Sequence, residues 1–198
     1  MYYRLNCQFH TYQNGDSANG KPLTPLPKDP QAVWWSGKPA AFGLSNVVFA
    51  VDQKVTLFDN YPVGGTYAQL YSQRFLDLLA AAGVHFQAIP ATLVDRTTKQ
   101  VCSTNYALFH LLERYPAIDT VRSKPNHIIL REDFLQNPRP MFRPDESGSN
   151  IFLSAELKAQ IDAARITGCI YDSIEKLRTG ISFLGPNRQY ARAPQEPD

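Results

Sequence analysis

The sequence predicts an α+β fold, in which a mixed, mainly antiparallel sheet and a few packed helices form a single domain. Short runs of β-branched and aromatic residues alternate with stretches whose apolar residues recur every three or four positions. A chain of 198 residues is also long enough for one sizeable core. We expect an N-terminal strand and a Gly/Pro-rich arm in residues 1–45, an α+β domain in 46–178 that shares its core with that strand, and an extended tail in 179–198.

The N-terminal part of the chain contains one clear strand pattern. Aromatic and polar residues mix at strand period from Tyr2 to Phe9, which predicts a strand. Asn14 to Pro30 predicts a long loop or arm, because its prolines lack the N–H that a sheet ladder needs. Two β-rich runs flank Asp52-Gln53 within residues 46–59 and predict a hairpin.

Two helices are expected in the middle of the chain. The first should begin near Thr66, which can cap its opening turn, and end at Gly83. "VHFQAI" follows as a strand up to Pro90, and "ATLVD" is a candidate continuation of the sheet. The second helix is expected over residues 105–114, and "NHIILRED" (126–133) is expected to be a strand.

The C-terminal part repeats the pattern of the first helix. Residues 151–153 predict a strand, Ser154 an N-cap, and Gly168 the end of the helix, after which "CIY" begins another strand. Placing Ser72 on Ser154 aligns the apolar stripes of the two helices, which predicts two similar helices packed on a shared sheet. Duplication and convergent amphipathic design explain the match about equally well. The aligned pairs are Phe75 with Leu157, Leu79 with Ile161, and Ala82 with Ala164.

Charge and cysteine content limit the class of protein. The net charge of +2 is small and its charges are scattered, which argues against a nucleic-acid partner. The sequence contains no apolar run long enough to span a membrane and no secretory signal at its start. Cys7, Cys102 and Cys169 are odd in number and far apart, which predicts reduced thiols in a cytoplasmic protein.

The residues whose side chains could act in catalysis or bind a metal form no convincing pattern for either role. Cys7-x-x-His10 lacks the second pair that a structural zinc site needs, so no metal is expected. Cys102 and His110 could be imagined as nucleophile and base, but neither lies in a known motif, and His110 is expected to be a core or half-buried residue of a short helix. "PVGGTYAQL" lacks the lysine of a phosphate-binding loop. The sequence thus predicts no catalytic residue and no cofactor.

Aromatic residues in or beside loops are candidates for binding a protein partner. Trp34, Trp35, Tyr61 and Tyr67 are of this kind, and such side chains are enriched in interface hot spots. Packing of both tryptophans on the sheet is an equally good alternative.

Two blocks of the chain resemble a known family. "SQRFLDLLAAAGVHFQAIPATLVD" and "MFRPDESGSNIFLSAELKAQIDAARITGCIYDSI" are similar to conserved segments of the Imm11 (DUF1629) family of bacterial immunity proteins. The intervening "NYALFHLLERYPAIDTVRSK" resembles a third segment of that family, so the similarity covers about half of the chain, from Ser72 to Ile174. Tyr171 and the "LLERYPAID" stretch depart from the family pattern. The matching positions in the C-terminal block are Phe142, Arg143, Ile151, Ser154, Leu157, Lys158, Ala164, Ile166, Thr167 and Gly168.

The resemblance implies an immunity protein that binds and neutralises a cognate toxin domain. Such toxins belong to polymorphic systems used in interbacterial competition, including Rhs effectors and toxins delivered by type VI or contact-dependent secretion. The lack of a signal peptide implies a toxin that acts in the cytosol. We expect Trp34, Trp35, Tyr61 and Tyr67, followed by Arg122 and Arg143, to contact the toxin, although Arg143 could instead hold a turn or a helix end together. The alternatives are an enzyme that reverses the toxin's modification and a module that binds a small ligand.

Overall fold

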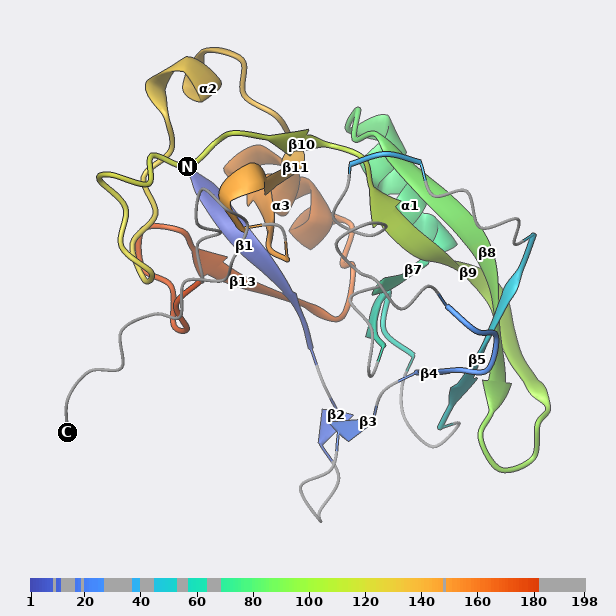
Figure 1. The fold of residues 1–198 in the computed structure, drawn as a ribbon. Coiled ribbons are helices and arrows are strands. Elements are labelled where there is room, and N and C mark those ends of the chain that lie inside the picture. Colours follow the sequence, from blue (N-terminus) through green and yellow to red (C-terminus); the bar gives the residue numbers. More distant parts are fainter. Residues whose placement is uncertain are drawn as a thin grey trace, which may run out of the picture.

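The computed structural model describes residues 1–8, 10–11, 17–18, 20–26, 37–39, 45–52, 57–63, 69–147 and 149–181 (Figure 1). These residues form three α-helices, one 3-10 helix and a set of mostly short strands. Their bounds are β1 (Tyr2–Cys7), β2 (His10–Thr11), β3 (Ser17–Ala18), β4 (Lys21–Pro22), β5 (Val47–Val51), β6 (Asn60–Pro62), β7 (Gln69–Ser72), α1 (Gln73–Ala81), β8 (Phe86–Asp95), β9 (Val101–Leu111), β10 (Arg114–Tyr115), α2 (Glu132–Gln136), β11 (Met141–Pro144), the 3-10 helix (Asp145–Ser147), β12 (Ile151–Ser154), α3 (Ala155–Ala163) and β13 (Cys169–Ser173).

The strands assemble into two main sheets. One has the order β10-β11-β12-β1-β13 and the other the order β4-β5-β8-β9-β7-β6, while β2 and β3 pair only with each other. Most pairs are antiparallel, and the parallel pairs are β5 with β8 and β10 with β11. The structure confirms the predicted α+β class with a mixed, mainly antiparallel arrangement.

Each main sheet contains one copy of the same strand–helix–strand unit. In the first copy β7, α1 and β8 follow one another, and β9 lies between the two strands of the unit. In the second copy β12, α3 and β13 follow one another, and β1 lies between the strands. The strand and helix that open each unit occupy residues 69–81 and 151–163, a shift of 82 residues, which confirms the alignment of Ser72 with Ser154. The prediction that the two helices pack on one shared sheet is wrong, because each unit belongs to a different sheet.

The two helices begin and end in the same way. The Ser72 and Ser154 side chains accept hydrogen bonds from the backbone N–H groups of Phe75 and Leu157, three residues into each helix. Gly83 and Arg165, which again lie 82 residues apart, both have positive φ angles, +76° and +53°. The backbone N–H that follows each of them donates to a carbonyl five residues earlier, as in a Schellman motif.

Several predicted boundaries of these units are wrong. The first helix does not begin near Thr66, because residues 69–72 form β7, and Thr66 itself lies outside the described residues. The helix α3 ends at Ala163, and the left-handed residue that follows it is Arg165 rather than Gly168, whose positive φ instead leads into β13. Ala164 is exposed, so the buried stripe of α3 is limited to Leu157 and Ile161.

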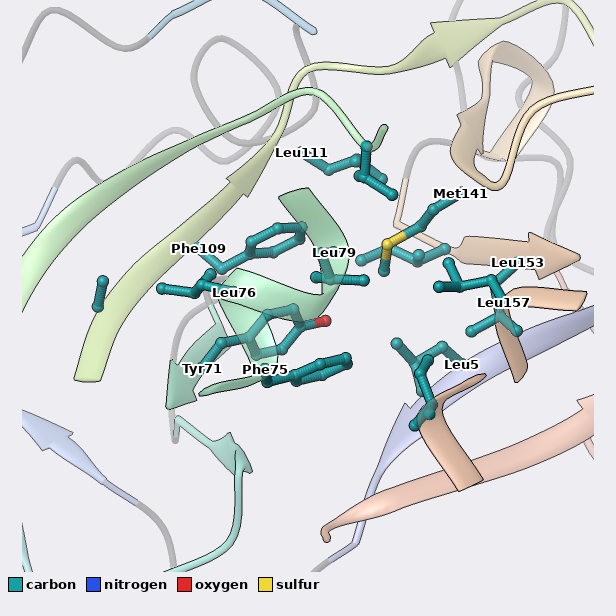
Figure 2. Packing of buried hydrophobic residues seen from close by; sticks show 14 residues of the cluster. Leu5, Tyr71, Phe75, Leu76, Leu79, Phe109, Leu111, Met141, Leu153 and Leu157 are labelled. Atoms are coloured by element: carbon teal, nitrogen blue, oxygen red, sulfur yellow. The ribbon is translucent and has the colours of Figure 1, made fainter. Parts of the chain in front are cut away.

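One hydrophobic cluster joins the two units. The helices α1 and α3 contact each other, and each also contacts the strand inserted in its own unit, β9 and β1 respectively. Figure 2 shows Tyr71 and Phe75 side by side in this core, and their ring centroids are 4.5 Å apart. The two sheets therefore share one core. The cluster consists of Leu5, Tyr71, Phe75, Leu76, Leu79, Val84, Ala107, Phe109, Leu111, Met141, Ile151, Leu153, Leu157 and Ile161.

Three other predictions outside the repeated units are also wrong. The expected helix over residues 105–114 is mostly strand β9, because its continuous apolar run is buried between β8 and β7. The expected hairpin in residues 46–59 does not form around β5, whose neighbours are β4 and β8. The expected strand over residues 126–133 contains isolated bridges and the start of α2. By contrast, β8 does continue through Pro90, because β5 pairs only with the residues from Ala91 onward.

The α-helices of the described residues are at most nine residues long. None of them is long and apolar enough to cross a membrane.

Candidate partner-binding surface

Of the six residues predicted to bind a partner, three lie outside the described residues, two are buried and one is exposed. Trp34, Trp35 and Tyr67 lie outside the described residues. Tyr61 lies in β6 and is only 1% exposed, because it is part of a hydrophobic cluster with Phe49 of β5. The Tyr61 side chain is therefore not part of the surface, contrary to its predicted place beside a loop.

Arg143 is also buried, so the prediction that it contacts a partner is corrected by the structure. It is 3% exposed in β11, its backbone N–H donates to the Glu113 carbonyl at 2.8 Å, and its guanidinium reaches the Ser149 carbonyl at 3.4 Å. Burial lowers the pKa of Arg143 to about 10, while the nearby Tyr71 phenol acts in the opposite direction. These contacts suit the alternative role of holding the turn after the 3-10 helix.

Arg122 is exposed and lies on a tight turn between β10 and α2. The Asp119 carboxylate accepts hydrogen bonds from the backbone N–H groups of Val121 and Arg122, both at 3.1 Å. The Ser123 hydroxyl donates to the Ile129 carbonyl at 3.1 Å, and the Ile129 N–H donates to the same hydroxyl oxygen at 2.9 Å. This network fixes the turn, so the side chains of Val121 and Arg122 are presented on a rigid support.

The loop that carries Arg122 is anchored to the end of β13. The Ile128 N–H donates to the Ile174 carbonyl at 2.7 Å, and His127 Nδ1 lies 2.6 Å from the Glu175 carbonyl oxygen. A second hydrophobic cluster fills the space beneath the loop, which gives this part of the molecule a core of its own. That cluster consists of Tyr2, Ala117, Ile118, Ile128, Leu130, Phe134, Phe142, Phe152, Ile174, Leu177 and Ile181.

A hollow of about 340 Å³ lies next to Arg122. Its lining is mostly apolar, with Arg122, His127 and Glu175 as its polar residues. The residues that line it are Met1, Tyr2, Arg122, His127, Ile128, Ile129, Leu130, Leu135, Ile174 and Glu175.

Two exposed apolar side chains line this hollow, and a third lies on the neighbouring turn. Among the described residues, the large hydrophobic side chains that are exposed are those of Met1, Leu23, Val101, Val121 and Leu135. Met1 and Leu135 line the hollow, at 68% and 49% exposure, and Val121, at 92%, lies on the turn that carries Arg122. We call the face formed by Met1, Val121, Arg122, His127, Leu135 and Glu175 the Arg122 surface.

Arg122 lies near two carboxylates beside the Arg122 surface. Arg122 Nη1 lies 3.8 Å from an Asp119 oxygen and 3.7 Å from a Glu132 oxygen, and all three side chains are at least partly exposed. Exposed pairs of this kind contribute about 0–1 kcal/mol, so Arg122 can exchange these partners for another carboxylate at low cost. An apolar patch with an adaptable arginine is typical of protein interfaces.

The structure separates Cys102 from His110, the residues considered as nucleophile and base. Both lie on β9, eight residues apart, which corresponds to about 26 Å along a strand. His110 is fully buried in a strand rather than on a helix, and its Nε2 lies 2.7 Å from the Lys38 carbonyl oxygen. Burial lowers the pKa of His110, against the effect of that hydrogen bond. The two side chains therefore cannot act on one substrate atom.

The remaining candidates for chemistry have ordinary structural partners. His85 Nδ1 lies 3.1 Å from a Glu113 oxygen, a carboxylate partner that the sequence did not reveal. Among the described residues, no group of three or more His, Cys, Asp or Glu side chains could hold a metal ion. Gly64 and Gly65 of the "PVGG" segment and the side chain of His10 lie outside the part of the chain that can be described.

Comparison with known proteins adds no further assignment. No protein-family model matches the chain, and a search of curated proteins found no match.

Proposed function

We propose that the protein is an immunity protein that binds and neutralises a cognate bacterial toxin which acts in the cytosol. The observation that carries the proposal is the Arg122 surface, where exposed apolar side chains line and adjoin a hollow next to a dedicated hydrophobic cluster. The resemblance of Ser72 to Ile174 to the immunity-protein family supplies the class of partner. The protein would act in the cytoplasm, where the toxin does its damage.

Inhibition would be stoichiometric and would require no chemistry from this chain. An apolar segment of the toxin domain would enter the hollow, with Leu135 and Met1 at its edge. Arg122 would pair with a toxin carboxylate as water leaves the contact. A stable complex of this kind buries at least about 1,200 Å², enough to cover an active site or to block its substrate.

The matched variants Val121→Asp and Val101→Asp test the proposal. Both valines are exposed, at 92% and 62%, but only Val121 lies on the Arg122 surface. We expect Val121→Asp to weaken binding of the toxin domain encoded by the adjacent upstream gene by about tenfold or more, because a charge would be desolvated at the interface. Val101→Asp should leave the Kd within about twofold, as for a residue outside the contact. Calorimetric titration and survival of toxin-producing cells measure the two effects.

Two results would contradict the proposal. One is the lack of any complex between the wild-type protein and that toxin domain at micromolar concentrations. The other is equal binding by both valine variants, which would move the interface away from the Arg122 surface.

A separate experiment distinguishes binding from an enzyme that reverses the toxin's modification. Cys102 and His85 are partly or largely exposed, and both can be replaced, as Cys102→Ser with His85→Gln, without opening the core. We expect the double variant to protect cells as well as the wild-type protein does. Loss of protection with an intact toxin complex would favour the enzyme.

A further inference from the structure

Cys7 and Cys169 lie directly opposite each other on neighbouring antiparallel strands. The register of β1 and β13 pairs the two residues, and the Gln8 N–H donates to the Gly168 carbonyl at 2.8 Å. A hydrogen bond between the residues just beyond a pair identifies a non-hydrogen-bonded pair, in which the Cα atoms are about 4.5 Å apart and the side chains are closest. That spacing lies within the range of about 4.4–6.8 Å found for disulfides.

The two thiols also point to the same place. Paired residues on neighbouring strands direct their side chains to the same face of the sheet. The Cys7 thiol donates to Asn60 Oδ1 at 3.0 Å, and the Asn60 side chain also lies close enough to the Cys169 thiol to lower its pKa against the effect of burial. Since Asn60 is fully buried in β6, both sulfur atoms converge on a single amide at the junction of the two sheets.

Burial keeps both thiols protonated at neutral pH, so the thiolate that reacts with a disulfide is a minor species of each cysteine. Burial raises the pKa of the Cys7 thiol to about 12 and that of the Cys169 thiol to about 11. Taken as whole residues, Cys7 and Cys169 are half-buried rather than fully buried. A reducing cytoplasm would therefore hold the pair as dithiol.

We propose that Cys7 and Cys169 are a redox modification site, which a low-molecular-weight disulfide converts into a cross-strand disulfide between β1 and β13. The thiolate of one cysteine attacks the reagent disulfide, forms a mixed disulfide and releases one reagent thiol. The thiolate of the other cysteine then attacks the protein sulfur of the mixed disulfide and releases the second reagent thiol. Two protein thiols lose two protons and two electrons, and one reagent disulfide is reduced to two thiols.

The new bond would affect the stability of the N-terminal strand. β1 lies between β12 and β13 and supplies Leu5 to the shared core. A bond between residues 7 and 169 closes most of the chain into a loop, which restricts the unfolded state. We expect the melting temperature to rise by several degrees on oxidation and to return on reduction.

Peptide mapping of the full chain after incubation with oxidised glutathione tests the site. We expect one linked species, which joins the peptides of Cys7 and Cys169 and has lost the mass of two hydrogen atoms. The Cys102→Ser variant should give the same linkage, because Cys102 lies on β9 and is not part of the pair. Cys7→Ser and Cys169→Ser should each leave the other cysteine as a glutathione mixed disulfide.

Three results would overturn the assignment. Glutathione on both Cys7 and Cys169 without a linkage would show that the sulfur atoms do not meet. A linkage that includes Cys102, or one between two chains, would show that the reaction follows exposure rather than the strand register. The site is independent of the proposed toxin binding, because the readout needs no partner.

Discussion

The units β7-α1-β8 and β12-α3-β13 share one backbone plan but differ where each meets the rest of the molecule. Their serine caps, helix lengths and left-handed C-terminal residues coincide. The first unit uses glycine at that C-terminal position and the second uses Arg165. The second unit instead places a glycine, Gly168, three residues later, where its chain is pressed against another strand. The left-handed turn after the helix is therefore the same in both units, whereas the position of glycine depends on where the chain is tightly packed against another strand.

Besides the shared hydrophobic cluster, the two units are linked by polar contacts through Asp59, which lies just before β6. Its carboxylate accepts hydrogen bonds from the backbone N–H and the hydroxyl of Thr167, each at 2.8 Å. It also accepts bonds from the Ser72 hydroxyl and from the Arg74 guanidinium, both of the first unit. One buried carboxylate thus joins the helix start of the first unit to the turn that follows the helix of the second.

Replacement of Gly168 should give the largest difference between the units. A Cβ at Gly168 would lie 2.5 Å from the Asn60 carbonyl oxygen and 2.6 Å from Phe58 Cβ, at a φ of +82°. We expect Gly168→Ala to lower the free energy of unfolding by about 4 kcal/mol, from the strained backbone and the steric overlap together. Urea denaturation measures the change.

Gly83→Ala is the matched control for this substitution. Gly83 has a similar φ of +76°, but a Cβ there would meet nothing within 4 Å. The expected loss is therefore only the backbone cost of about 1 kcal/mol. Equal losses at the two glycines would show that the contact with Asn60 is not tight.

Removal of the Asp59 charge should have the next largest effect. Asp59→Asn keeps the size of the side chain but leaves the donors of Arg74 and Thr167 without an ionised acceptor. We expect the free energy of unfolding to fall by about 3 kcal/mol. This value is at the lower end of the cost of breaking a buried ion pair, because the Arg74 side chain is 55% exposed. If Asp59→Asn lowers the free energy of unfolding by less than about 1 kcal/mol, Asp59 does not link the two units as described.

The same carboxylate should make stability depend on acid. Burial would raise the pKa of Asp59, but hydrogen bonds from Arg74, Ser72 and Thr167 outweigh it and hold the pKa well below its usual range. A depressed pKa contributes stability above the unfolded value of about 3.9 and loses it as the pH falls further toward the folded value. The difference between the wild-type protein and Asp59→Asn should be constant above about pH 5 and shrink below about pH 4. A difference that stays constant to lower pH would assign the stabilisation to packing.

The sequence predicted the local parts of these units better than their surroundings. Ser154 was predicted as a helix cap because the cap depends on residues three positions apart. The strand β9 was predicted as a helix, since a continuous apolar run such as residues 106–111 fits either structure until its neighbours are known. The burial of Tyr61 could not be predicted for the same reason, because it depends on the pairing of β6 with β7.

The candidate surface was still harder to predict. Six residues were expected to bind a partner. Arg122 is exposed, Tyr61 and Arg143 are buried, and the other three lie outside the described residues. Met1 and Leu135 are far apart in sequence and share a hollow only through the fold. Val121 alone carried a local signal, as an apolar residue within a polar loop.

The smallest predicted difference concerns the two serine caps, which make the same helix contact. Ser154 accepts a hydrogen bond from the Leu157 N–H at 3.1 Å, so Ser154→Ala should lower the free energy of unfolding by about 1 kcal/mol. Ser72 accepts the equivalent bond from Phe75 and also donates to Asp59 at 2.6 Å, so Ser72→Ala should cost about 2 kcal/mol. In an Asp59→Ala background, which removes both acceptor oxygens, the two serine substitutions should cost the same, because only the cap remains to be lost. If Ser72→Ala still costs more than Ser154→Ala in that background, the additional stabilisation by Ser72 comes from contacts other than its hydrogen bond to Asp59.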